Sequence, residues 1–164
     1  MEGYYNIPVD DVKGVTALWQ NVFHDSPDFI QRYLQLYAIP NNYVVERDNA
    51  GEIIGMAHCP VIHDKYGNSY TYLYAVAVAP EYRGKGIASR LIHEVISKST
   101  TDFIATIPAS ESLQKWYHDN FGFVYPDLAI ALPEDDGFDL GTGDSATDIF
   151  MVKFLNTNDY ETKR

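Results

Sequence analysis

The residues best suited to chemistry form a glycine-containing turn between an expected strand and an expected helix. The run from Arg83 to Ala88 reads RGKGIA, and it follows an apolar stretch that ends at Ala79. Backbone N–H groups in the first turn of a helix lack helical partners, and the helix dipole makes that end positive. Gly84 and Gly86 carry no Cβ, so the backbone can approach a ligand closely. The pattern predicts binding of an anion such as a pyrophosphate.

Two familiar phosphate-binding motifs fit this turn poorly. A P-loop requires Ser or Thr directly after its lysine, but Gly86 follows Lys85. A dinucleotide fingerprint requires a third glycine, and Ser89 stands at that position. In addition, the four residues 80–83 separate the expected strand from the first glycine.

The passage from Val78 to Ala88 resembles motif A of the GNAT acetyltransferase superfamily. That family shows V-x-P-x-x-R followed by Arg/Gln-x-x-Gly-x-Gly/Ala, and this chain reads VAPEYR and then RGKGIA, sharing Arg83. The expected order of elements from about Val9 to Leu155 is also similar to that family. The resemblance implies an α+β fold of the GNAT type, with a mixed, mostly antiparallel central sheet flanked by helices. It also implies an N-acetyltransferase that uses acetyl-CoA as its cosubstrate.

The resemblance places the cosubstrate on the backbone of this passage. In such enzymes the strand end pairs with the pantetheine arm, an amide there polarises the thioester carbonyl, and the turn holds the pyrophosphate. The implied cosubstrate-binding residues are Val76, Ala77, Val78, Arg83, Gly84, Lys85, Gly86, Ile87, Ala88 and Ser89.

The resemblance also implies a general acid that protonates the coenzyme A thiolate as it leaves. The family pattern is similar to Asn-x-x-Ala-x-x-x-Tyr followed by Gly-Phe, and here Ser110 stands at the Asn position. Counting forward from Ser110 gives Tyr117. Counting back from Gly122-Phe123 gives His118, because this chain carries one extra residue there. Tyr117 is the preferred assignment, and His118 is the alternative.

Transfer to an amine also requires a group that takes up the amine proton. The residues near the expected cleft are Glu46, His58, His63, Tyr72 and Tyr74, and each also has an ordinary structural role open to it. An ordered water is a further alternative. No group of His, Cys, Asp or Glu residues shows metal-ligand spacing, so no metal is expected.

The charge of the chain excludes some partners. The net charge is −11 over 164 residues, whereas nucleic acid binding depends on neutralising phosphates with Lys and Arg. The same field would attract a cationic amine of a small molecule or peptide. Within the loop from Pro133 to Asp148, four acids are hypothesised to recruit it, with a solvated loop as the alternative: Asp135, Asp136, Asp139 and Asp144.

Length and composition indicate one domain over residues 1–164, with a tail that frays after about residue 156. Cys59 is the single cysteine, and the N-terminus lacks the pattern of a secretory signal, so we expect a cytoplasmic location. No membrane association is expected, and a homodimer is possible for this family. Two alternatives to the amine acetyltransferase stay open: a non-catalytic acyl-CoA-binding or sensing module, and an enzyme for another acyl chain or an oxygen acceptor.

The elements that must position these residues follow from caps and periodicity. Two opening helices are predicted, the first capped by Asp10 or Asp11 and the second by Ser26. Further helices begin at residue 87 and after Ser110. Strands are predicted at 43–46, 53–62 and 70–79 as an antiparallel meander, and at 102–107, parallel to the strand before the helix. Two final strands are predicted at 128–132 and 149–155.

Overall fold

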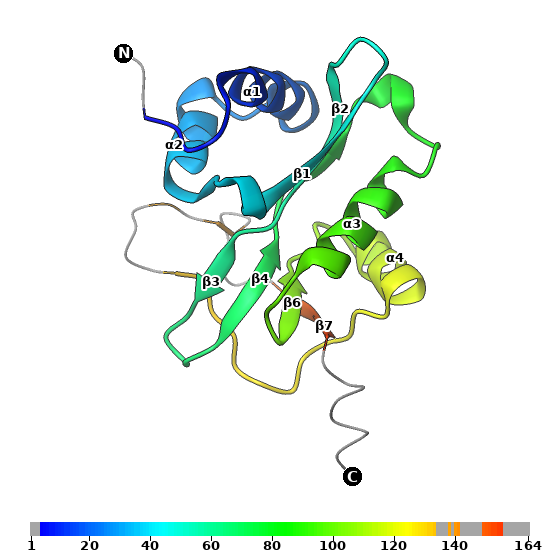
Figure 1. Ribbon diagram of the computed structural model, residues 1–164. Coiled ribbons are helices and arrows are strands. Elements are labelled where there is room, and N and C mark those ends of the chain that lie inside the picture. Colours follow the sequence, from blue (N-terminus) through cyan, green and yellow to red (C-terminus); the bar gives the residue numbers. More distant parts are fainter. Residues whose placement is uncertain (1–3, 134–137, 139, 142–148, 156–164) are drawn as a thin grey trace. The chain divides into compact units, whose positions relative to one another are not determined.

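The computed structural model describes residues 4–133, 138, 140–141 and 149–155 (Figure 1). The chain forms two compact units, one made of Met1–Pro60 and Ala75–Lys98, the other of Val61–Tyr74 and Ser99–Arg164. Each unit contains its own sheet, of three strands in the first and four in the second. The elements therefore make the α+β fold expected from the sequence. The single domain over residues 1–164 stays a prediction.

The sheet of the first unit is antiparallel and has the strand order β1-β2-β5. Its strands are β1 (Tyr43–Arg47), β2 (Ile53–His58) and β5 (Val76–Val78). The pairing of β1 with β2 shifts register between Glu46 and Arg47, where Glu46 lies opposite Gly55. The two residues on either side of this shift each form an ion pair, Glu46 with Arg90 and Arg47 with Asp11.

Helices cover both faces of this sheet (Figure 1). On one face lie α1 (Val9–Phe23) and α2 (Pro27–Tyr37), and on the other lies α3 (Ile87–Lys98). Two 3₁₀ turns, η1 (Pro40–Asn42) and η2 (Pro80–Tyr82), precede β1 and the glycine turn. Successive β2 side chains point to opposite faces. His58 accordingly packs against Trp19 of α1, with ring centroids 5.2 Å apart, whereas the backbone at Gly55 lies against α3.

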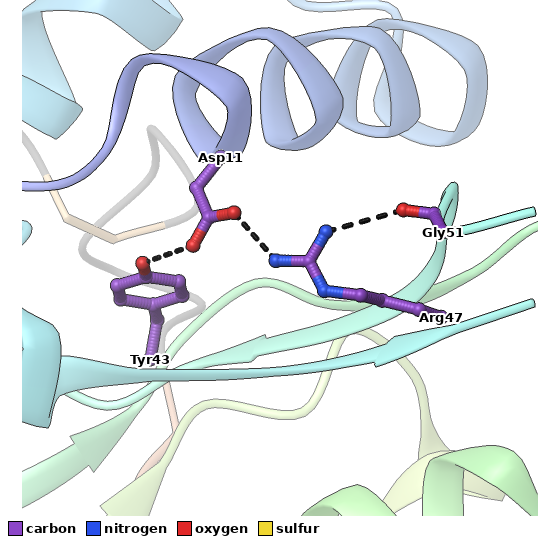
Figure 2. Close-up of polar contacts among 4 residues, drawn as sticks. All are labelled: Asp11, Tyr43, Arg47 and Gly51. Carbon is purple, nitrogen blue, oxygen red and sulfur yellow. Dashed lines mark hydrogen bonds and ion pairs between the residues drawn. The ribbon is translucent and has the colours of Figure 1, made fainter.

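One of the two predicted helix caps in this unit is confirmed and the other is wrong. The Phe29 N–H donates to Ser26 Oγ at 3.1 Å, with Pro27 in the first helical position. By contrast, α1 begins at Val9, so Asp10 and Asp11 lie inside its first turn. Asp11 instead accepts hydrogen bonds from the Tyr43 hydroxyl and Arg47 Nη2, each at 2.5 Å (Figure 2). These partners reach the carboxylate from β1, a contact that local spacing does not reveal.

The sheet of the second unit has the order β3-β4-β6-β7. Its strands are β3 (Val61–His63), β4 (Ser69–Leu73), β6 (Phe103–Thr106) and β7 (Met151–Phe154). β4 and β6 run parallel, as predicted for the two strands before and after a helix, and the other pairs are antiparallel. Helix α4 (Glu111–Phe121) begins at the predicted cap, because the Leu113 N–H donates to Ser110 Oγ at 3.2 Å. It ends at Gly122, whose φ is 78°.

The predicted meander is wrong because two of its strands are each divided between the two sheets. The stretch 53–62 forms β2 and β3, which are separated at Cys59 and Pro60. The stretch 70–79 forms β4 and β5, which are separated at Tyr74 and Ala75. Pro60 has no N–H to donate to a ladder, and the Cys59 N–H donates to Asn42 O at 2.7 Å, outside the β1–β2 pairing.

The strand predicted at 128–132 is also wrong, since these residues form no ladder. Side chains from the β3–β4 hairpin satisfy the backbone there instead. Asn68 Nδ2 donates to Ala129 O and the Tyr70 hydroxyl donates to Ala131 O, each at 2.7 Å, while Ala131 N–H donates to Asp64 Oδ2 at 2.9 Å. The last predicted strand is confirmed, because β7 lies within 149–155.

Candidate active site

The outer edge of β5 offers backbone groups to a ligand. The Ala79 N–H donates to Ile54 O at 2.8 Å, and Ala77 lies opposite Met56. Hydrogen-bonding direction alternates along an antiparallel strand, so Ala77 faces β2 while Val76 and Val78 turn their N–H and C=O groups away from it. Because β5 is the last strand in its sheet order, these groups line an edge that β2 does not use.

The chain leaves this strand through a braced turn. The Tyr82 N–H donates to Ala79 O at 2.9 Å, within η2. The side chain of Arg83 folds back, so that its Nε donates to Val78 O at 3.1 Å. Arg83 therefore ties the start of the glycine turn to the strand end, in addition to carrying the positive charge that the sequence indicated.

The glycine turn has a backbone conformation that gathers N–H groups. Gly84 and Gly86 both have φ of 80°, whereas Lys85 between them has a negative φ. Successive residues with φ of opposite sign direct their N–H groups into a concavity that favours an anion. A Cβ on Gly84 would meet no atom within 4 Å, so the left-handed φ and not crowding is what requires glycine there.

The first turn of α3 adds three further donors. The first helical bond runs from Arg90 N–H to Gly86 O at 3.1 Å. The N–H groups of Ile87, Ala88 and Ser89 therefore come before the first bonded helical N–H, that of Arg90, and have no partner within the helix. Together with the positive end of the helix dipole, they extend the donor set of the turn. Its chemistry fits a diphosphate, and the donors belong to the residues that the sequence indicated.

Gly55, which no motif in the sequence singled out, brings α3 close to the sheet. A Cβ on Gly55 would lie 2.7 Å from Ile87 Cγ2 and 3.1 Å from Leu91 Cδ1. The backbone of β2 thus contacts the side chains of the first turns of α3 directly. A glycine inside a strand pattern is the signal that indicates such a close approach.

Tyr117, the preferred general acid, lies on α4 in the second unit. It is buried, with its ring 5.3 Å from that of Phe123. Burial raises the pKa of Tyr117 to about 12, although a hydrogen bond with the Thr106 side chain lowers it in part. The Thr106 hydroxyl itself donates to Leu73 O at 2.9 Å, across the β4–β6 pair. The phenol is therefore neutral near pH 7 and carries a proton.

His118, the alternative acid, has a different environment. It is exposed, and its Nδ1 lies 2.9 Å from Phe123 O, just beyond the end of α4. A carbonyl only accepts, so this contact assigns the hydrogen to Nδ1. One ring nitrogen of His118 is thus used for a backbone contact at the helix end.

Two candidate bases in the first unit are held in structural contacts. The Glu46 carboxylate accepts hydrogen bonds from Arg90 Nη2 at 2.6 Å and from Arg90 Nε at 3.1 Å, which makes a bidentate ion pair. His58 is fully buried, and burial lowers its pKa to about 3. Its Nε2 lies 3.4 Å from Met56 Sδ, and its Nδ1 has no hydrogen-bond partner in the described structure. Burial of this kind disfavours the protonated, charged form that a base must adopt.

The other candidate bases belong to the second unit. His63 Nδ1 lies 2.7 Å from Ser69 Oγ in the β3–β4 hairpin. The Tyr72 hydroxyl donates to Leu140 O at 2.8 Å, and the Tyr72 ring stacks on Tyr74 with centroids 5.5 Å apart. Because both oxygens of Glu46 are held by Arg90 and His58 is buried, the identity of the base stays open among His63, Tyr72, Tyr74 and water. The four loop acids Asp135, Asp136, Asp139 and Asp144 lie outside the described residues.

The described ranges contain neither a candidate metal site nor a helix that could span a membrane. No three side chains of His, Cys, Asp or Glu come together there in a way that could hold a metal ion. None of the helices described combines the length and the apolar character that a membrane span requires. The expected cytoplasmic location and the possible homodimer stay predictions.

Solved structures share the fold of this chain. The GNAT family N-acetyltransferase YhbS from Escherichia coli, in complex with CoA, has 20% identity and a TM-score of 0.66 over 96% of this chain and 86% of that chain. Arylalkylamine N-acetyltransferase 2 from Aedes aegypti has 14% identity and a TM-score of 0.66 over 92% and 97% of the two chains. At these identities the likeness concerns the fold.

A third similar structure is a glucosamine N-acetyltransferase region in a fungal multi-domain β-N-acetylglucosaminidase. It has 22% identity and a TM-score of 0.58, and this chain spans 77% of its own length but only 17% of the fungal chain. No curated protein matches the chain. The family model for the GNAT acetyltransferases, however, matches residues 13–123, which is more than half of the sequence. The chain therefore belongs to the GNAT acetyltransferase family, whose characteristic cosubstrate is acetyl-CoA.

Proposed function

We propose that the protein is an N-acetyltransferase that moves an acetyl group from acetyl-CoA to a primary amine of a small molecule or peptide. The observation that carries this proposal is the pair of left-handed glycines at the start of α3, beside the outer edge of β5. Both features use backbone donors, and both lie in the same unit. They suit a ligand that has a diphosphate at one end and an amide-containing arm at the other.

Each part of this backbone has a role in holding the cosubstrate. The N–H groups from Gly84 to Ser89 bind the diphosphate, with Lys85 adding positive charge, whereas the Arg83 N–H already donates to Pro80 O at 3.3 Å. The outward-facing N–H and C=O groups of Val76 and the N–H of Val78 bind the pantetheine arm, because Ala77 is paired with β2 and Val78 O accepts from Arg83. Bound acetyl-CoA supplies the acetyl group as a thioester, which is activated toward amines.

The reaction exchanges one bond for another at the acetyl carbon. The amine nitrogen attacks that carbon, a C–N bond forms and the C–S bond breaks, while the nitrogen loses a proton and the sulfur gains one. Tyr117 is the proposed donor to sulfur, and His118 is the alternative. A thiol has an ordinary pKa of about 8.5, so a phenol with a pKa of about 12 gives up its proton only with help.

Calorimetry with acetyl-CoA and with free coenzyme A tests the binding site. Gly84→Ala should weaken binding at least tenfold, because a Cβ is strained at φ of 80° and the turn must rearrange. Gly51→Ala is the matched control, since Gly51 also has a positive φ, of 86°, and open space around it. It should carry a similar folding cost and leave affinity unchanged. An absence of binding by the unmodified protein would refute the proposal.

Release of free coenzyme A thiol across a panel of amines tests the chemistry. Tyr117→Phe should lower kcat by about 10² or more with little change in KM, because the proton donor to sulfur is removed. His118→Gln should leave kcat within about twofold of the unmodified enzyme. The reverse pattern would assign the acid to His118.

The second candidate function is an acyl-CoA-binding module without turnover. It is favoured by the extra residue between Tyr117 and Gly122 and by the burial of the Tyr117 ring. This function requires tight binding of acetyl-CoA with no thiol release for any amine, including long-chain polyamines and N-terminal peptide amines. Release with a longer acyl donor or an alcohol acceptor would instead support a different acyltransferase.

A further inference from the structure

We propose that Arg90 is a positioning residue that fixes the direction of a backbone amide in the anion-binding turn, and that Glu46 holds it in place for this purpose. The inference rests on the proposed function of the turn. The inference goes beyond that function because it assigns a role to two side chains, whereas the turn itself binds through backbone N–H groups.

The guanidinium of Arg90 joins the sheet to the turn. Its Nε and Nη2 donate to the two carboxylate oxygens of Glu46 at 3.1 Å and 2.6 Å, and its Nη1 donates to Lys85 O at 3.2 Å. All three nitrogens therefore have partners. Because a guanidinium is a rigid plane, the two bonds to Glu46 fix where the third nitrogen points.

The bond to Lys85 O determines where the next N–H points. In a trans peptide the C=O and the following N–H point in opposite directions within one plane. With Lys85 O held on the Arg90 side, the Gly86 N–H must point to the opposite side. This peptide is flanked by Gly86 and lies one residue after Gly84, and glycines permit rotations that other residues resist. Arg90 thus opposes a flip of the Lys85–Gly86 peptide. Such a flip would point Lys85 O, in place of the Gly86 N–H, toward the bound anion.

The sheet gives Glu46 a rigid base. Glu46 lies on β1 opposite Gly55, at the register shift that precedes Arg47. Register shifts of this kind redirect side chains locally. Glu46 points toward α3, whereas the next residue, Arg47, reaches Asp11 of α1. The carboxylate is therefore held by a strand that also contacts α3.

Charge distinguishes positioning from direct phosphate binding. The Arg90 side chain is 57% exposed and that of Glu46 is 28% exposed, so both remain hydrated and their pairing adds little to stability. As long as Arg90 is paired with a carboxylate, the pair presents no net charge to an anion. If Arg90 bound the phosphate directly, removing the Glu46 carboxylate would strengthen anion binding. If Arg90 only positions the turn, removing that carboxylate would weaken anion binding.

The test compares acetyl-CoA with acetylpantetheine, a thioester donor that lacks the diphosphate. Glu46→Gln and Arg90→Lys should each raise the KM for acetyl-CoA, and the dissociation constant of coenzyme A, by about tenfold. We expect kcat to stay within about twofold. The kcat/KM with acetylpantetheine should not change, because that donor does not reach the turn. Lys115→Met is the matched control, since it breaks the exposed Lys115–Asp119 pair on α4 and should change none of these values.

A charge reversal gives an independent check. The double variant Glu46→Arg with Arg90→Glu restores an ion pair, but a glutamate has no hydrogen to donate to Lys85 O. It should therefore remain as weak toward acetyl-CoA as Arg90→Lys. Recovery of affinity would overturn the positioning role and leave a purely structural pair.

The outcomes separate this inference from the proposed function. Tighter binding of coenzyme A by Glu46→Gln would show that Arg90 is a direct ligand and overturn the inference. Equal losses with both thioester donors would also overturn it, because a general structural defect would be responsible. If the unmodified protein binds coenzyme A and the variants bind equally well, only the positioning role fails. If the unmodified protein binds none, the proposed function itself fails.

Discussion

Two consecutive residues of β1 form ion pairs on opposite faces of the same sheet, and the pairs differ in burial. Arg47 binds Asp11, whose side chain is 13% exposed and also receives the Tyr43 hydroxyl (Figure 2). Glu46 binds Arg90, whose side chain is 57% exposed. Charges that are removed from water depend on their partners, whereas hydrated charges do not. The α1 face thus uses its pair for stability, and the α3 face uses its pair for geometry.

Removing Asp11 should have the largest effect on stability. Asp11→Ala deletes the acceptor of two charge-assisted hydrogen bonds and leaves the Tyr43 hydroxyl without its partner. We expect the free energy of unfolding to fall by about 3 kcal/mol in chemical denaturation. Tyr43→Phe should cost about half as much, because the pairing with Arg47 remains. An Asp11→Ala protein as stable as the unmodified one would remove the contrast between the two faces.

The Asp11 contribution should also depend on pH. Burial raises the pKa of this carboxyl, but the hydrogen bonds from Tyr43 and Arg47 lower it by more than burial raises it. The folded-state pKa is therefore below the ordinary value of 3.8. The stabilisation is therefore present above that ordinary pKa and is lost as pH falls through the folded one. The difference between unmodified protein and Asp11→Asn should shrink in acid below about pH 4.

For glycine substitutions we expect the larger loss of stability on the α3 face of the sheet, the reverse of the order expected for the two ion pairs. Gly55→Ala on the α3 face forces a Cβ to within 2.7 Å of Ile87 Cγ2, on a stiff β-branched side chain. We expect it to cost about 2 kcal/mol and to weaken coenzyme A binding, because α3 must move. Gly14→Ala on the α1 face meets the flexible end of Ile53 at 2.8 Å and gains helix propensity. It should be close to neutral, and an equal cost at both positions would contradict the comparison.

His58 should make the α1 face sensitive to mild acid. Its folded-state pKa is lowered by burial to about 3, against an ordinary value of 6.5. Between these values the unfolded chain binds a proton that the folded protein does not. Stability should therefore fall by about 1.4 kcal/mol for each pH unit below 6.5. His58→Phe should reduce this slope in urea titrations at pH 6.5, 5.5 and 4.5, and an unchanged slope would assign it to other groups.

The exposed pair Lys115–Asp119 should have the smallest effect. Its nitrogen and oxygen are 2.7 Å apart on successive turns of α4, and both side chains are largely hydrated. Lys115→Ala should leave the denaturation midpoint unchanged within error at physiological salt. A clear loss of stability would mean that hydrated pairs matter in this protein, including the one at Arg90.

The sequence predicted best what depends on neighbouring residues. Ser26 and Ser110 were recognisable as caps, because a cap needs only the N–H groups two or three residues later. The glycine turn was recognisable for the same reason. The partners of Asp11 and Arg90 lie 32 or more residues away along the chain, so local spacing cannot reveal them. Each divided strand likewise reads as one apolar run, although its halves pair with different strands.

The segment after α4 was misread because its hydrogen bonds come from side chains. An apolar run between Pro126 and Pro133 favours a strand, yet Ala129 and Ala131 are bonded to Asn68, Tyr70 and Asp64. Candidate site residues could be proposed from the sequence only where a family motif covers them. Gly55 acts through its close packing against α3, and the Glu46–Arg90 pair acts through a hydrogen bond to Lys85 O. No motif includes either kind of contact.

The residues after α4 are held by hydrogen bonds to their backbone carbonyl oxygens, and this affects which positions tolerate substitution. Asn68, Tyr70 and Tyr72 donate to the carbonyl oxygens of Ala129, Ala131 and Leu140, three groups that any of the twenty amino acids would supply. These bonds are therefore indifferent to the side chains of Ala129 and Ala131, whereas the Leu140 side chain is itself buried in the core. Substitutions other than proline at Ala129 and Ala131 can accumulate without breaking these bonds, while changes at Asn68 or Tyr70 would remove them and leave only the bond from the Ala131 N–H to Asp64.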